Sequence, residues 1–161
     1  MAGDVTPALC AAVPRAGSWE GRFADADVPA EEVRAILAAA RVAPSADNLQ
    51  TWRFVTVRSA ATRKALSAAV AGPVAEAIAA APVVVVACGV RAVVSRARRE
   101  QPFVMIDVPI AVAHLLLQAI ELGLAVAWTL DADERAVREA LSIPADVRVV
   151  AVAALGWPAT G

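Results

Sequence analysis

The sequence has no tyrosine, a single histidine and only two cysteines among its 161 residues. The two thiols, Cys10 and Cys88, have neither metal-ligand spacing nor the number needed for a disulfide framework, which favours a reducing, cytoplasmic location. No catalytic triad, carboxylate pair or metal-ligand cluster is evident, so we predict no catalytic side chain and no metal site. The four tryptophans are expected to be the bulky pieces of a core that is otherwise rich in alanine and valine.

Strong charge and long apolar runs are also lacking. A net charge of −1 gives no electrostatic reason to expect nucleic acid or an anionic membrane surface as a partner. The longest apolar run, residues 78–90, is too short to cross a bilayer and contains Pro82. Residues 1–13 have no cationic start and do not resemble a signal peptide. We expect one soluble domain over residues 1–161, with an irregular arm over residues 1–27.

Hydrophobic spacing and turn residues predict alternating strands and helices, and therefore a mixed α and β domain with a central sheet covered by helices. Strands are expected over residues 52–57, 83–86, 124–130 and 147–155, and helices over 29–43, 59–70, 73–80, 102–122 and 131–141. The helix over 102–122 is apolar almost all round and should be buried, in part against a second subunit. Pro109 should kink that helix or mark its true start. Asp131 and Glu134 resemble a capping box for the last helix.

A polar loop separates the first predicted helix from the first predicted strand. Pro44 disfavours helical geometry at Ala43, and hydroxyl or amide side chains follow at Ser45, Asn48 and Gln50. Such a group would suit a flat ligand that forms hydrogen bonds. The alternative is a loop whose side chains satisfy only its own backbone.

This loop is part of a longer run, Ala-Pro-Ser-x-x-Asn-x-Gln-x-Trp-x-Phe over residues 43–54, which resembles the signature of the nitroreductase-like flavoproteins. Two later segments also resemble that family. Residues 107–124 resemble its central helix with a Gly-Leu exit, and residues 141–158 resemble its ending. The three matches occur in the family's order and cover nearly the whole chain.

The resemblance implies an α+β fold with a mixed, mainly antiparallel sheet flanked by helices. It implies a homodimer that holds FMN at the subunit interface, with the long buried helix at that interface. The implied activity is an FMN-dependent oxidoreductase that passes hydride from NADH or NADPH through the flavin to an electron-poor small molecule.

Specific contacts are implied as well. By resemblance, Pro44 and Ser45 would lie near the isoalloxazine ring and ribityl chain, while Asn48 and Gln50 would reach the flavin in the partner subunit's site. Residues 130–131, Leu130 and Asp131, would present backbone N–H groups towards flavin N5, and Trp128 beside them would shape the acceptor pocket. A plain helix cap is at least as good an explanation of Asp131.

The chain departs from the family where the FMN phosphate is held. Only Arg22 and Phe23 match the family's basic N-terminal segment, and no basic residue follows the final Gly-Trp-Pro before Gly161. The arginines of residues 91–101 are an alternative source of charge, although such a run is typical of a solvated face. Two other functions therefore stay open. One is a dehydrogenase that tailors a peptide-derived natural product, resembling cyclodipeptide or azoline oxidases and needing a companion subunit. The other is a flavin-free relative that acts as a binding partner.

Overall fold

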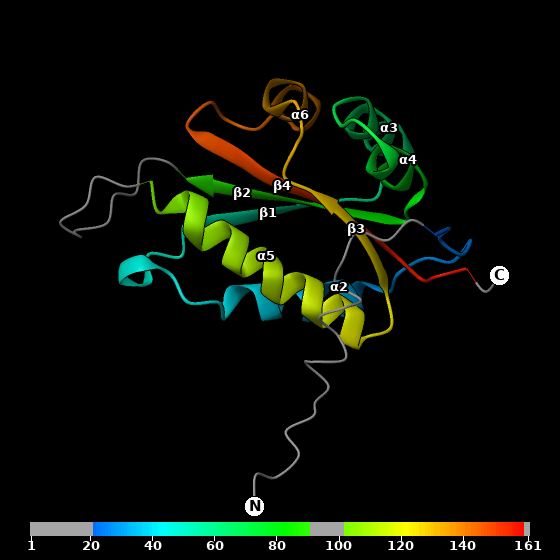
Figure 1. Cartoon of the computed structure of the whole chain (residues 1–161), viewed down its shortest axis with the longest axis horizontal. Coiled ribbons are helices and arrows are strands. Elements are labelled where there is room, and N and C mark those ends of the chain that lie inside the picture. Colours follow the sequence, from blue (N-terminus) through cyan, green and yellow to red (C-terminus); the bar gives the residue numbers. More distant parts are fainter. Residues whose placement is uncertain (1–20, 91–101, 160–161) are drawn as a thin grey trace, which may run out of the picture.

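The described part of the chain contains one antiparallel sheet with helices on both sides (Figure 1). The computed structural model describes residues 21–90 and 102–159. The strands are β1 (Trp52–Val57), β2 (Val83–Val90), β3 (Ala125–Thr129) and β4 (Val147–Gly156), in the order β1-β2-β4-β3. The helices are α2 (Ala30–Arg41), the short 3₁₀ helix η2 (Ala46–Asn48), α3 (Ala60–Ala68), α4 (Pro73–Ala80), α5 (Val104–Glu121) and α6 (Glu134–Leu141). The expected α+β class is confirmed, and every strand pair in the described part of the chain is antiparallel.

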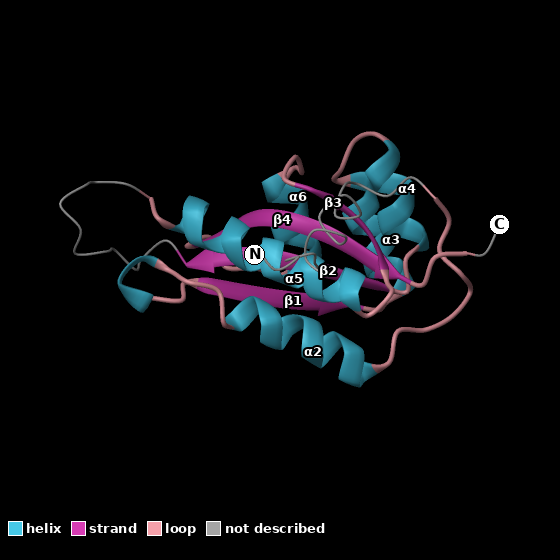
Figure 2. Ribbon diagram, turned by 60° about the horizontal axis from the view of Figure 1, so that its bottom comes forward, coloured by secondary structure: helices cyan, strands magenta, loops and turns pink. Residues whose placement is uncertain are grey.

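The helices form two layers. Figure 1 shows α2 and α5 on one side of the sheet and α3, α4 and α6 on the other, and Figure 2 shows the same division from a second direction. We call these sides the α5 face and the α3 face. Strand β2 explains the division, because Val83 and Val85 belong to the core of the α5 face and Val84 and Val86 to the core of the α3 face. A strand buried on both faces needs such an unbroken apolar run.

Helix α5 begins at Val104 and continues through Pro109. The alternative that Pro109 marks the start of this helix is therefore wrong. The first turn is instead fixed upstream, where the N–H groups of Ile106 and Asp107 donate to the carbonyl of Phe103 at 2.8 and 2.7 Å. A proline within the helix removes one backbone hydrogen bond, which the burial of the helix offsets.

The other end of α5 is a Schellman motif. Gly123 has φ +85°, and its N–H donates to the carbonyl of Ile120 at 2.9 Å, while Leu124 donates to Ala119 at 2.9 Å. This confirms the expected glycine cap. Helix α5 is long and apolar enough to cross a membrane, but half of it is buried inside the protein, which is the pattern of a core helix. It is not buried all round, because Met105 and Ile106 are each 40% exposed.

Helix α6 corrects the predicted capping box. Its N-cap is Asp133, whose carboxylate accepts from the N–H groups of Arg135 and Ala136 at 3.0 and 3.1 Å. Asp131 cannot take that place because the next two residues are held in extended pairing. Ala132 forms a β-bridge with Val70, and the N–H of Asp133 donates to the carbonyl of Ala69 at 2.8 Å. The helix begins only where these contacts end.

Residues 21–29 form an irregular arm that is tied to the end of the chain. Phe23 forms a β-bridge with Pro158, and the indole N–H of Trp157 donates to the carbonyl of Asp27 at 3.1 Å. The rest of the predicted arm, residues 1–20, and the arginine-rich run of residues 91–101 lie outside the described residues.

Candidate functional site

The polar loop of residues 44–50 contains unusual backbone geometry. Asp47, Asn48 and Gln50 have φ values of 48°, 54° and 48°, in the left-handed region, which aspartate and asparagine adopt more readily than glutamine does. Each such residue costs on the order of 1–3 kcal/mol and persists only where surrounding contacts hold it. Clusters of this kind are typical of binding sites and active sites.

Local hydrogen bonds account for part of this geometry. The hydroxyl of Ser45 accepts from the N–H of Gln50 at 3.0 Å, and the side-chain amide of Gln50 donates to Asn48 Oδ1 at 3.1 Å. Arg53 Nη1 donates to the carbonyl of Trp52 at 2.7 Å and reaches that of Gln50 at 3.4 Å. The structure therefore brings Ser45, Asn48 and Gln50 close together through contacts within the loop. The side chains of Asn48 and Gln50 are nevertheless exposed, so they remain accessible to a ligand.

A contact from a distant part of the chain also holds the loop. The N–H of Ala46 donates to Asp107 Oδ1 at 3.1 Å, which joins η2 to the first turn of α5. Sequence reasoning gave Asp107 no role of its own. The available signal was a carboxyl group in the strongly apolar first half of this helix.

An apolar pocket of about 290 Å³ lies on the α5 face, between α5 and the end of β3. Its lining is Pro109, Val112, Ala113, Leu116, Leu117, Trp128 and Leu130. Leu130 is 57% exposed, which is unusual for a large aliphatic side chain in an otherwise well-packed domain. Small-molecule sites usually have mostly apolar walls with a few polar groups among them, and this pocket provides the apolar walls.

Asp131 follows this pocket, and its backbone N–H already has a partner. It donates to the hydroxyl of Thr129 at 2.9 Å. This hydrogen bond competes with the contact from Asp131 to flavin N5 that the family resemblance implies. The side chain of Asp131 is exposed and is not the cap of α6.

Arg22 lies apart from the loop and the apolar pocket. It lines a cavity of about 340 Å³ beside α4, together with Phe23, Pro73 and Glu76 among others, and α4 covers the opposite face of the sheet. Within one chain the structure therefore brings together residues 44–50, places Leu130 and Asp131 at the end of β3, and separates Arg22 from both.

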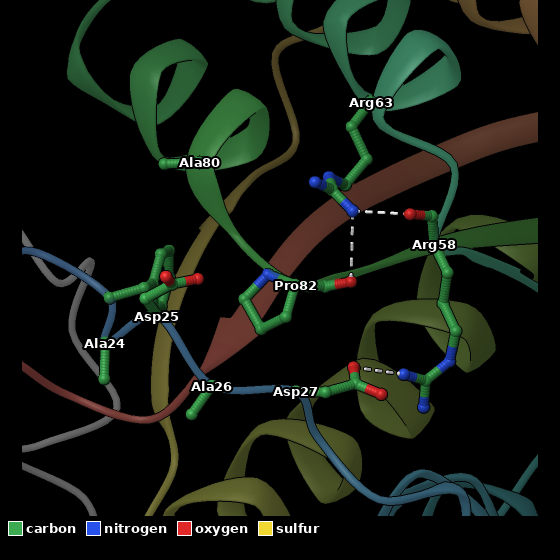
Figure 3. Close-up of a pocket in the computed structure, with 9 residues that line it drawn as sticks. Ala24, Asp25, Ala26, Asp27, Arg58, Arg63, Ala80 and Pro82 are labelled. Atoms are coloured by element: carbon green, nitrogen blue, oxygen red, sulfur yellow. Dashed lines mark hydrogen bonds and ion pairs between the residues drawn. The ribbon is translucent and has the colours of Figure 1, made fainter.

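A larger cleft of about 540 Å³ adjoins the N-terminal arm (Figure 3). Its two arginines are engaged with the protein itself. Arg58 pairs with Asp27 at 2.6 Å and donates to the carbonyl of Val28 at 2.6 Å, while Arg63 donates to the carbonyls of Arg58 and Pro82. These contacts hold residues 27–28 against the β1–α3 junction. The two arginines of the cleft therefore stabilise the fold.

The buried cysteine is poorly suited to act as a nucleophile. Cys88 is 1% exposed, and burial, with a smaller contribution from Glu134, raises the pKa of its thiol to about 11. A thiol with such a pKa is almost wholly protonated at neutral pH and reacts slowly. Among the described residues there is also no group of three or more side chains that could hold a metal ion.

Comparison with known proteins identifies relatives along the whole described domain. The sequence model of the Nitroreductase family matches residues 22–157. A protein of Archaeoglobus fulgidus named "Putative NADH dehydrogenase/NAD(P)H nitroreductase" is 32% identical over 142 residues, covering 84% of this chain and 78% of the relative. A protein of the same name from Methanothermobacter thermautotrophicus is 31% identical and covers 86% and 71%.

Solved structures agree with these sequence matches. A nitroreductase family protein from Clostridium novyi NT superposes with a TM-score of 0.87 at 25% identity, covering 94% of this chain and 85% of the other. An FMN-dependent nitroreductase from Clostridium difficile R20291 superposes with a TM-score of 0.77 at 25% identity, covering 89% and 84%. The extent of the sequence match and the shared fold together show that the chain belongs to the nitroreductase family.

Proposed function

We propose that the protein is an FMN-dependent oxidoreductase that takes hydride from NADH or NADPH and passes it to an electron-poor small molecule. Membership of the nitroreductase family supports an oxidoreductase. The observation that carries the proposal is the strained loop of residues 44–50, which exposes two amide side chains on the face that also holds an apolar pocket. The names of the archaeal relatives and of the Clostridium difficile structure support the choice of donor and cofactor.

The residues of the α5 face fit the ring system of FMN. Isoalloxazine has two apolar ring faces and a polar edge, and the chain provides apolar walls at Trp128 and Leu130 and amide groups at Asn48 and Gln50. Pro44 and Ser45 would lie against the ring and the ribityl chain. The phosphate would have Arg22 as its proposed partner. When bound, FMN supplies the acceptance and donation of hydride, and the chain needs no catalytic side chain of its own.

The role of the protein in this proposal is to bind and orient. Preformed amide and hydroxyl groups would orient the flavin, since an anchored loop loses little entropy on binding. The apolar walls would keep water away from the ring and leave room for a flat acceptor. The backbone N–H of Leu130 would donate towards the edge of the flavin ring. This hydrogen bond would stabilise the reduced form of the cofactor.

The proposal includes a homodimer, because these groups lie apart within one chain. The loop of residues 44–50 would serve the site of one subunit, and residues 130–131 would belong to the site of the other. The exposed apolar side chains Met105 and Ile106 on α5 support this proposal, because large apolar groups gathered on one surface mark an interface. We propose a soluble, cytoplasmic dimer, for which the absence of any metal-ligand or disulfide pattern at the two cysteines is a supporting feature.

The first test is the visible spectrum of the purified protein and its titration with FMN. The expected result is a flavin band at about 450 nm and about one flavin per chain, in a particle that sediments as a dimer. Colourless protein that does not bind added FMN would overturn the proposal and favour the flavin-free relative. Flavin binding that requires a co-expressed second protein would favour the dehydrogenase with a companion subunit.

The proposed contact between Arg22 and the FMN phosphate can be tested by comparison with riboflavin. Riboflavin lacks the phosphate, so the ratio of FMN affinity to riboflavin affinity measures how well the phosphate is held. One charge-assisted hydrogen bond contributes about 1.5–3 kcal/mol, or on the order of 10–100-fold in affinity. Arg22→Ala should therefore reduce the FMN preference by about that factor and leave riboflavin binding unchanged. An unaltered ratio would remove Arg22 from the site.

A further inference from the structure

Asp107 is an acid in a place where acids are rare. It is 2% exposed, and Thr51 is the other buried polar residue of the described chain. Its Oδ1 accepts from the N–H of Ala46, and its Oδ2 has no hydrogen-bond partner among the described residues. A buried carboxyl group with one oxygen unpaired is costly for a folded protein. A contribution to folding stability alone is therefore a poor reason for its presence.

Its position in the helix does not require burial either. An acid in the first turn of a helix interacts favourably with the helix dipole, but exposed acids also make this interaction, so it does not require burial. Glu31 and Glu32 in the first turn of α2 are acids of that ordinary kind. Asp107 instead directs one oxygen to a backbone N–H that is 61 residues away in the sequence.

The loop needs an anchor of this kind. The left-handed residues Asp47 and Asn48 directly follow Ala46, and Gln50 comes two residues later. The contact from Ser45 lies within the loop and moves with it, and Arg53 on β1 reaches only the carbonyl of Gln50 at the end of the loop, at 3.4 Å. The hydrogen bond from Ala46 to Asp107 connects the loop to a long helix that is packed in the core.

We propose that Asp107 is a positioning residue for the cofactor. Its carboxyl group fixes the N–H of Ala46 and thereby holds residues 47–50 in the conformation that presents Asn48 and Gln50 to the flavin. This inference rests on the proposed function and adds a residue that does not itself touch the cofactor. Loss of the anchor leaves the amide groups in place but no longer preorganised, so binding must order the loop.

The test measures FMN affinity by quenching of flavin fluorescence in the full-length protein. Asp107→Leu removes the acceptor and should weaken FMN binding about tenfold or more, since an anchored loop becomes a mobile one. Asp107→Asn keeps an oxygen acceptor in the same place and should bind within about threefold of the wild type. Rescue by asparagine separates a missing hydrogen bond from a missing side chain.

Ala46→Pro removes the same hydrogen bond from the other partner. Proline has no N–H and is tolerated at the first position of a helical turn, and Ser45 before it is already extended, with φ −141° and ψ 157°. This variant keeps the side chains of α5 but leaves both oxygens of Asp107 unpaired among the described residues, so its melting temperature is measured beside its FMN affinity. It serves if Asp107→Leu does not fold. It should weaken FMN binding by the same factor as Asp107→Leu.

Two further measurements distinguish positioning from general destabilisation. Ile78→Val on α4 removes one buried methylene on the α3 face and should lower the melting temperature by a few degrees, about 2–4 °C, without a change in FMN affinity. Asp107→Leu combined with Asn48→Ala should weaken binding by less than the product of the single effects, because both act through the same loop. Hydrogen exchange of residues 43–51 without FMN should increase in Asp107→Leu and stay constant in Ile78→Val.

Failure of the positioning role can be distinguished from failure of the proposed function. If the wild type binds FMN and both Asp107→Leu and Ala46→Pro bind it within about twofold of the wild type, Asp107 has no positioning role. A double variant whose effects multiply in full would also overturn the inference. If the wild type itself does not bind FMN, the proposed function fails first, and the positioning role towards the cofactor fails with it.

Discussion

The two faces of the sheet differ in how their polar and strained groups are used. On the α3 face, polar groups serve the fold. Ser59 and Asp133 cap helices α3 and α6, and Glu134 accepts from the N–H of Val149 at 3.2 Å and lies 3.7 Å from Arg138. Cys88 is buried there with its pKa raised. This face is typical of a structural core.

The α5 face retains features that cost stability. Three non-glycine residues of the loop are left-handed, Asp107 is buried with one oxygen unpaired among the described residues, and Met105, Ile106 and Leu130 are exposed. Natural proteins keep such local violations mainly at functional sites, where binding requires them. The contrast supports the proposed site on the α5 face and predicts that stability and flavin binding can be separated by mutation.

The largest effect should come from the core of the α3 face. Leu66 on α3 is fully buried, so Leu66→Ala should lower the free energy of unfolding by about 2–5 kcal/mol through lost burial and the cavity that remains. The FMN affinity of the folded fraction should not change. Urea unfolding and flavin fluorescence measure the two quantities on the same sample. A large loss of affinity would show that the two faces are not independent.

High pH should lower the free energy of unfolding through Cys88 on the α3 face. The pKa of Cys88 is raised from 9.0 to about 11, so the unfolded chain loses its thiol proton before the folded one does. The stability from this group is complete below pH 9 and is lost as the pH rises to about 11, by roughly 2–3 kcal/mol. Cys88→Ala should flatten this part of the pH dependence, as measured by urea unfolding at a series of pH values. Equal slopes for both proteins would contradict the prediction.

Asn48 tests the α5 face with a smaller effect. Asn48→Ala removes the amide and should weaken FMN binding by about tenfold, or about 1.4 kcal/mol, without unfolding the protein. It also places alanine at φ 54°, which costs on the order of 1 kcal/mol of stability. Asn48→Gly is the matched control, since glycine tolerates that φ and also lacks the amide. Both variants should lose affinity equally, and only Asn48→Ala should lose stability. If Asn48→Gly binds FMN normally, the amide does not contact the flavin.

Much of this architecture could be predicted from local patterns. The bounds of β1 and α4 agree with the prediction, because Pro73 and Pro82 and the alternation after residue 51 mark them in the sequence itself. The strand over residues 83–86 was placed correctly but is longer, since its pairing with β4 carries it past Gly89 to Val90. The cap of α6 was missed because it depends on a contact between Asp133 and Ala69.

For the candidate site too, local sequence patterns predict only contacts between residues that are close in the sequence. Ser45, Asn48 and Gln50 are close in sequence, so a motif could group them, and the structure confirms that Ser45 bonds to Gln50 and Gln50 to Asn48. The contact between Asp107 and Ala46 joins residues 61 apart, and no periodicity or turn preference specifies such a pairing. Local patterns predict elements and short motifs, whereas tertiary packing decides which distant residues meet.

The smallest predicted effect is an increase in the free energy of unfolding, whereas Leu66→Ala lowers it. Ser142, at the end of α6, has φ 54° and is the one non-glycine residue of the described chain outside residues 47–50 with a positive φ. Glycine is the usual residue at this helix end, so Ser142→Gly should raise the free energy of unfolding by about 0.5–1 kcal/mol. FMN affinity should stay constant, because this strain lies on the α3 face and serves no ligand. Asn48→Gly should instead cost affinity, because it also removes the amide proposed to contact the flavin. If Ser142→Gly weakened FMN binding, strained backbone could no longer be used to tell the functional face from the structural one.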